Sequence, residues 1–237
     1  MALILNIETS TEVCSVSLAK SGNLVVMKES NEGFNHSRSL TVFIEELFKE
    51  NNLKINAIDA VAVSKGPGSY TGLRIGVSVA KGLCYGLNIP LISICSLEMM
   101  AVHTARNLEK YVSERSSLPF LFCPMIDARR MEVYTALYNT EGKEIRPVSA
   151  EIIEKNFLSE LLEKHQILFF GNGAGKCKDR INHQNALFAG PAETSAQFMQ
   201  VISELKFKKQ EFEDVAYFEP FYLKNFVATI PKDKILK

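Results

Sequence analysis

The chain of 237 residues carries 27 Lys and Arg against 27 Asp and Glu, so its formal net charge is zero. Proteins dedicated to nucleic-acid binding usually have a basic excess that neutralises phosphates, and this balance argues against that class. A chain of this size buries roughly 70% of its surface on folding. With a hydrophobic fraction of 46%, it therefore predicts one large domain or two smaller ones with a stable core.

The five cysteines predict a reducing compartment. None of them forms a CxxC pair, and most lie in apolar runs, which is typical of buried thiols in the cytosol. Met1 leads directly into a strand-like segment, so we expect no signal peptide. No apolar run reaches the roughly 20 residues of a membrane span. The sequence therefore predicts a cytoplasmic protein without a membrane contact.

The first half of the chain predicts a repeating order of strands and helices. Apolar residues alternate or cluster in the strand segments, and they recur at helical spacing in the helical ones. The predicted strands cover residues 3–9, 13–19, 24–28, 57–64 and 91–94, and the predicted helices cover 35–51, 71–87 and a segment capped by Ser96.

The second half predicts a similar order. The predicted strands cover 120–126, 132–138, 143–148 and 167–170, and the predicted helices cover 149–164, 174–181 and 194–207. We therefore expect an α/β fold of two duplicated lobes, 1–108 and 109–237, each a mixed sheet covered by helices. This is the plan of the actin-like and ribonuclease H-like folds. The apolar tail 219–226 is expected to pack back on the body.

The turn after the first strand contains candidate phosphate ligands. In actin-like ATPases a carboxylate holds hydrated Mg²⁺ at this turn, and hydroxyls and amides hold phosphates. Glu8, Thr9 and Thr11 occupy these places here. The alternative is a polar hairpin whose hydroxyls bond their own backbone.

The helix predicted over 71–87 carries small residues at regular spacing. Gly72, Gly76 and Ala80 follow one another every four residues, and Gly82 and Gly86 form a second pair. Each interior Gly costs about 1 kcal/mol relative to Ala, and small residues at this spacing allow another helix to approach closely. The pattern leaves open whether that neighbour is the 35–51 helix or a second protein. The segment 65–76, which leads into this helix, offers free N-terminal amides to an anion, although it matches neither GxGxxG nor a Walker A loop. The simpler interpretation is that Ser69 or Thr71 is an N-cap.

No metal or nucleophile constellation emerges from the sequence. Leu40 stands four residues after His36, where a metal-binding helix would need a second His, and HExxH is absent. The segment 127–132 is a charged hairpin that mirrors the first turn, and self-satisfied ion pairs are its simplest interpretation. We therefore predict no metal and no cofactor.

Four blocks carry a specific resemblance, namely residues 7–16, 66–76, 126–134 and 219–223. They resemble the bacterial TsaB family, also called YeaZ, and the likeness covers nearly the whole chain. The Gly-Pro-Gly-Ser-Tyr-Thr-Gly block at 66–72 is its most specific part. The first turn is shared more widely across the actin-like superfamily.

The resemblance implies a non-catalytic subunit in tRNA threonylcarbamoyladenosine biosynthesis. Members pair with the paralogous transferase TsaD, and the ATPase TsaE joins them. Contact runs through the two long helices of the first lobe, which implies an interface at His36, Leu40, Gly72, Gly76 and Ala80. It also implies that Gly76→Leu leaves the chain folded but blocks association. A weak homodimer through the same helices and at most a minor tRNA contact are further expectations.

Two departures from the family pattern bear on these expectations. Glu8 stands where the family usually has Asp, and Met131 stands where it usually has Gly. The longer carboxylate at Glu8 makes Mg²⁺-nucleotide binding less favourable, so the phosphate-type turn is expected to be vestigial. The alternative function is an ATP-dependent phosphotransferase that uses this turn together with Gly171-Asn172-Gly173. A peptidase lacks any supporting residues.

Overall fold

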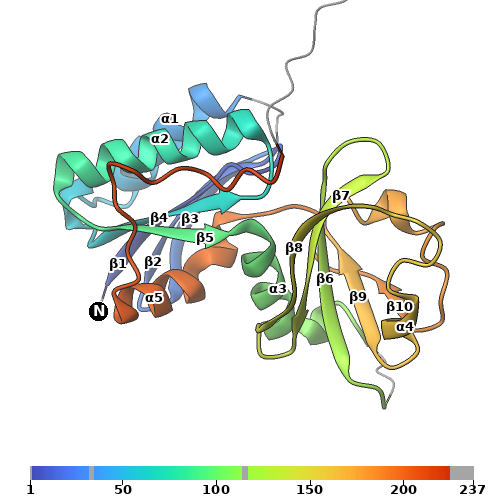
Figure 1. Ribbon diagram of the computed structural model, residues 1–237. Coiled ribbons are helices and arrows are strands. Elements are labelled where there is room, and N and C mark those ends of the chain that lie inside the picture. The colour runs from blue at the N-terminus through green and yellow to red at the C-terminus, as the bar shows by residue number, and fades with distance from the viewer. Residues whose placement is uncertain (1, 32–34, 114–116, 225–237) are drawn as a thin grey trace, which may run out of the picture.

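The computed structural model describes residues 2–31, 35–113 and 117–224. It contains two five-stranded mixed sheets, one in each lobe, with a helix, α3 (Ser96–Arg106), between them (Figure 1). No helix within these residues is long and apolar enough to span a bilayer. All five cysteines are buried and unpaired, as predicted.

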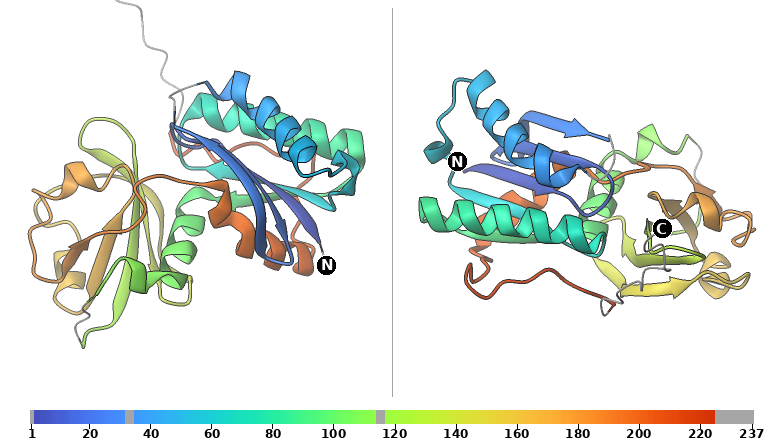
Figure 2. Two further views of the ribbon diagram at one scale, coloured as in Figure 1. Left: turned by 180° about the vertical axis from the view of Figure 1, so that it is seen from behind. Right: turned by 90° about the horizontal axis from the view of Figure 1, so that it is seen from above.

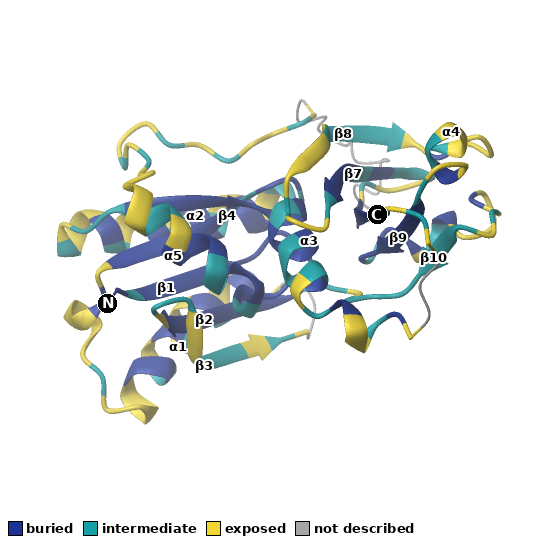
Figure 3. Cartoon of the chain, turned by 90° about the horizontal axis from the view of Figure 1, so that it is seen from below, coloured by how far each residue is buried: buried dark blue, intermediate teal, exposed yellow. Residues whose placement is uncertain are grey.

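The first sheet has the strand order β3-β2-β1-β4-β5. β1, β2 and β3 pair antiparallel, and β4 and β5 are parallel to β1. Its central strands are buried almost throughout (Figure 3). The strands are β1 (Leu3–Glu8), β2 (Cys14–Lys20), β3 (Asn23–Ser30), β4 (Ala60–Gly66) and β5 (Leu91–Cys95).

Side-chain alternation along β1 gives this sheet two buried faces. Leu5 and Ile7 contact one apolar cluster under α1 (His36–Glu50) and α2 (Tyr70–Leu87), which lie side by side on that face (Figure 2). Ile4 points to the opposite face. There α5 (Gln200–Lys209), from the other end of the chain, covers the sheet. The 3₁₀ turn η4 (Ala196–Met199) precedes it.

The second sheet repeats the topology of the first with the order β10-β9-β6-β7-β8. Three consecutive strands again pair antiparallel, and two further strands run parallel to the first of them. The duplicated α/β plan predicted from the sequence is therefore confirmed. The strands are β6 (Phe120–Asp127), β7 (Glu132–Asn139), β8 (Glu144–Ile152), β9 (Gln166–Phe170) and β10 (Ala186–Phe188).

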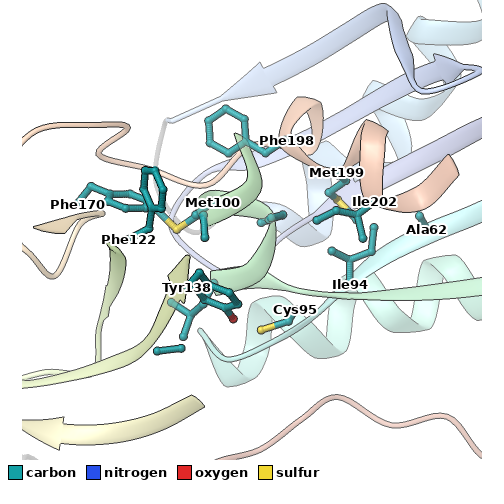
Figure 4. Packing of buried hydrophobic residues seen from close by; sticks show 14 of the residues in the cluster. Ala62, Ile94, Cys95, Met100, Phe122, Tyr138, Phe170, Phe198, Met199 and Ile202 are labelled. Carbon is teal, nitrogen blue, oxygen red and sulfur yellow. The ribbon is translucent and has the colours of Figure 1, made fainter. Parts of the chain in front are cut away.

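One apolar cluster joins the two lobes. Met100 of α3 extends toward Phe122 and Phe170 of the second sheet, while Met199 and Ile202 pack over the first (Figure 4). Because this core is shared, the lobes are not separated by an exposed linker. The division at residue 108 stays a prediction.

Several predictions for the second half were wrong. Residues 149–152, predicted as the start of a helix, continue β8, because Ala150 pairs with Tyr134. The helix over 149–164 shrinks to α4 (Ser159–Leu162), which starts after Leu158 at a φ of 58°. The helix over 174–181 is the 3₁₀ turn η3 (Gly175–Cys177), and β10 was not predicted. Two further 3₁₀ turns are η1 (Ile55–Ala57) and η2 (Leu108–Lys110).

After α5 the chain runs beside α2 as an extended segment that we call the C-terminal strap, residues 211–224 (Figure 2). Lys81 Nζ of α2 donates to the Ala216 and Phe218 carbonyls, each at 3.0 Å. At the far end Lys224 forms an ion pair with Glu132 of the second lobe. Up to residue 224 the predicted tail therefore packs on the body, and its residues 225 and 226 lie outside the described residues.

Candidate functional site

The predicted phosphate turn is closed to solvent. Glu8 ends β1, and the turn that follows leads into β2. Glu8, Thr9 and Ser10 expose no surface, and Thr11 is 5% exposed. A phosphate group cannot reach these hydroxyls and amides while the turn keeps this conformation.

The start of α2 covers this turn. A Cβ atom added to Gly68 would lie 2.2 Å from the Ser10 carbonyl oxygen, and one added to Gly72 would lie 2.1 Å from that of Thr9. The absence of side chains therefore lets the helix rest on the turn. The Ser69 amide donates to the Ser10 carbonyl at 2.7 Å. The specific Gly-Pro-Gly-Ser block thus works as a packing element.

This packing also corrects the predicted interface residues. A Cβ atom on Gly76 would lie 2.3 Å from Thr9 Oγ1, so the first small-residue stripe faces the chain's own turn and not a partner. At Gly72 and Gly76 the covering element is the β1–β2 turn, whereas the 35–51 helix, the internal alternative, packs against α2 elsewhere as α1. All five predicted residues are buried: His36, Leu40, Gly72, Gly76 and Ala80. They cannot form a contact surface in this structure.

A second segment closes the turn from the opposite side. Thr11 Oγ1 lies 2.9 Å from Thr194 Oγ1, in the segment that returns from the second lobe. The Ser15 hydroxyl accepts a hydrogen bond from the Ala196 amide at 2.8 Å. The lobes are therefore tied together where an actin-like ATPase would need an open cleft.

Glu8 is unsuited to hold Mg²⁺ here. Burial without a nearby cation raises the pKa of its carboxyl to about 7, although a hydrogen bond from the Ser10 amide at 2.5 Å opposes the shift. Its Oε2 atom has no hydrogen-bond partner within the described structure. Because the carboxyl is fully buried and the start of α2 lies directly against the turn, a Mg²⁺-nucleotide does not fit this turn in this conformation.

The Gly171-Asn172-Gly173 turn is likewise used for internal packing. A Cβ atom on Gly171 would lie 2.3 Å from the Met125 carbonyl oxygen. Asn172 accepts from the Asp127 amide at 2.9 Å and donates to Glu193 at 3.2 Å. Both polar atoms of the Asn172 side chain are therefore occupied by the second lobe itself. No group of three or more His, Cys, Asp or Glu within the ranges described could hold a metal ion.

The outer face of α2 is different from its inner face. A Cβ atom on Gly82 or Gly86 would meet nothing within 4 Å, so these glycines pack against no part of the described chain. Between them Tyr85 is 86% exposed. This second small pair was visible in the sequence, but the pattern did not tell which pair faces inward.

An apolar groove lies beside that face. It runs between α1 and α2 with a volume of about 550 Å³. Ile44 and Phe48 of α1 form one wall, and Val79 and Leu83 of α2 form the other. Val79 and Leu83 are partly exposed there, and Gly82 and Gly86 each follow one of them by three residues on the same side of α2, so they form one surface, which we call the helix-pair face.

Comparisons with known proteins identify the family of this chain. The family model of TsaD, described as tRNA N6-adenosine threonylcarbamoyltransferase, matches residues 32–232. The tRNA threonylcarbamoyladenosine biosynthesis protein TsaB of Bacillus subtilis is 31% identical over 226 residues, which cover 93% of each chain. The chain belongs to the TsaB family.

TsaB relatives match nearly the whole chain, whereas a transferase relative matches only part of it. TsaB of Escherichia coli is 29% identical, with 95% of this chain and 96% of that one covered. The transferase of Bacillus cereus is 34% identical over only 108 residues, which cover 39% of this chain and 32% of the enzyme. The structure of YeaZ from Pseudomonas aeruginosa has the same fold, with a TM-score of 0.77, 24% identity and coverage of 94% and 100%.

Proposed function

We propose that this chain is a non-catalytic subunit that binds a TsaD-like transferase and thereby supports threonylcarbamoyl transfer to adenosine in ANN-decoding tRNAs. The observation that carries the proposal is the helix-pair face, with Gly82 and Gly86 uncovered beside an apolar groove. The closed turn at Glu8 supports the absence of an ATPase step.

The energetics of α2 argue for a partner on this face. Gly82 costs the helix about 1 kcal/mol relative to alanine, Gly86 adds a smaller cost in the last turn, and no contact within the described chain offsets either. A second helix that crosses there gains close backbone contact, and the neighbouring apolar walls supply buried area. A paralogue that shares the duplicated plan would bring an equivalent helix pair, so a four-helix contact satisfies both chains.

Two further partners follow from the same proposal. A TsaE-like ATPase joins the pair, and the chain forms a weak homodimer when the transferase is absent, because two copies present the same helix-pair face. Sedimentation at increasing concentration should show a monomer–dimer equilibrium that added transferase dissolves. A strict monomer at high concentration would count against self-association.

Gly82→Leu tests the interface without disturbing the monomer. The new side chain enters open space and replaces a poor helix former, so the variant should unfold at the same or a higher temperature. It should bind the transferase at least about tenfold more weakly, because the partner helix can no longer approach. Gly175→Leu in the second lobe is the matched control, since its Cβ position is equally open. Calorimetric titration showing wild-type affinity for Gly82→Leu would refute this face as the interface.

A further inference from the structure

The hairpin between β6 and β7 ends in two arginines that the proposed function does not use. Figure 1 shows this hairpin projecting from the second sheet. Arg129 and Arg130 are both exposed, and both have left-handed backbone conformations, with φ of 72° and 52°. Two consecutive residues with side chains are rarely held in this region, where glycine or asparagine is preferred. The chain therefore keeps an unfavourable conformation at a tip that lies in water.

Two acidic groups of the hairpin are neutralised by other cations. Asp127 accepts from Lys176 at 2.5 Å, and Glu132 pairs with Lys224 of the strap. Within residues 2–31, 35–113 and 117–224, no ion pair involves Arg129 or Arg130. The sequence predicted that the charges of this hairpin would form ion pairs within the chain. The two carboxylates do so, whereas the two guanidinium groups form none within the described residues.

A hydrogen-bond network fixes the tip in place. The Asp127 carboxylate accepts from the Arg129 amide at 2.6 Å, and the Arg129 carbonyl accepts from the Glu132 amide at 3.2 Å. From below, Asn172 holds the Asp127 amide. The backbone that carries the two arginines is therefore held in one conformation by hydrogen bonds.

The tip and the neighbouring segment are basic, and the exposed apolar side chain nearest to them in the strand ladder is Ile152, which pairs with Glu132 at the base of the hairpin. Segments 127–132 and 175–180, joined by Lys176, carry five basic side chains against three acidic ones, although the whole chain is neutral. None of the large apolar side chains that are exposed in the described residues belongs to either segment. A protein interface normally has an apolar centre, whereas a phosphate backbone requires only charge and donors. These features favour RNA over an acidic protein.

We propose that the β6–β7 tip contacts the phosphate backbone of the tRNA, with the guanidinium groups of Arg129 and Arg130 as donors. Guanidinium offers a planar fork that matches phosphate oxygens, and such contacts position an RNA without reading its sequence. The inference rests on the proposed function, because the transferase brings the tRNA to the complex. It also limits the RNA contact to one basic site on a neutral chain.

The test measures tRNA binding at several salt concentrations. The complex of this chain with its transferase is titrated with an unmodified transcript of an ANN-decoding tRNA. The double variant Arg129→Gln, Arg130→Gln should bind about tenfold more weakly, and the slope of log K against log salt should fall by about 2. Lys208→Gln with Lys209→Gln removes two exposed charges from α5 and should change affinity less than about twofold.

Association of the two proteins is measured first, without RNA. If it fails for the wild-type chain, the proposed function is overturned, and the isolated chain at low salt then gives the same comparison of variants. If association holds and the double variant binds tRNA with unchanged affinity and salt slope, only the hairpin proposal is overturned. A loss of protein association with tRNA binding intact would assign the tip to an acidic protein instead.

Discussion

Glu8 is a carboxyl group that the fold has removed from water. Its side chain is fully buried, and one of its oxygens receives the Ser10 amide while the other has no partner in the described structure. Burial favours the protonated form, which explains why the pKa rises to about 7. The carboxyl group at this position is thus packed inside the protein rather than open to a ligand.

Glu8→Gln should stabilise the protein at alkaline pH. Because the folded-state pKa is raised, the wild-type carboxyl contributes fully below its ordinary value near 4.5 and loses that contribution as pH rises through about 7. Glutamine does not ionise, so the variant should gain up to about 3 kcal/mol at pH 8 and little at pH 4. Urea unfolding at both pH values measures the difference. An equal effect at the two pH values would contradict the buried-acid account.

The glycines of α2 fall into two classes that only the surroundings distinguish. Gly76 lies against Thr9, whereas Gly82 faces open space. Gly76→Leu, expected from the resemblance to leave the chain folded, should instead destabilise it by about 3 kcal/mol through overpacking.

Gly82→Ala should have the opposite sign and stabilise the chain by about 1 kcal/mol, because alanine is the better helix former. Thermal unfolding of the two glycine variants side by side tests the assignment of faces. Stability changes of the same sign would show that the inner and outer faces of α2 are assigned wrongly.

Elements with a clear period were predictable, and elements fixed by distant pairing were not. The first lobe follows its sequence pattern from β1 to α3 because four of its strands, β1, β2, β4 and β5, are buried almost throughout. Residues 149–152 have helix-compatible spacing, but pairing with β7 makes them a strand. β10 has only three residues and no fully buried side chain, so its pairing with β9 leaves little local signal.

The C-terminal strap is an element held by side chains rather than by regular structure. Lys81 provides two of its attachments, to the Ala216 and Phe218 carbonyls. Lys81→Met should lower stability by about 1 kcal/mol and speed amide hydrogen exchange in residues 211–221. Lys49→Met on α1 is a control with an exposed side chain. Unchanged exchange in the strap would mean that its apolar contacts alone hold it.

At the scale of the whole molecule, two lobes with the same strand order meet beside a turn that is closed to solvent. The sequence indicated the two lobes, the polar turn at Glu8 and the close packing of another segment against the small residues of α2. It did not indicate that the turn is sealed, because the sealing contacts join Gly68 and Gly72 to Ser10 and Thr9, and Thr11 to Thr194 across the lobes. Contacts between segments far apart in the sequence thus decide which motif residues are open to a ligand and which are buried inside the fold.

The central claim is that this chain acts through the helix-pair face and not through the turn at Glu8. One reconstituted reaction tests it directly: threonylcarbamoyl transfer to an ANN-decoding tRNA by the transferase and the ATPase, with the wild-type chain, Glu8→Gln or Gly82→Leu. The account predicts that Glu8→Gln supports the wild-type rate and that Gly82→Leu lowers it at least about tenfold at limiting subunit concentration. Loss of transfer with Glu8→Gln and full transfer with Gly82→Leu would contradict it.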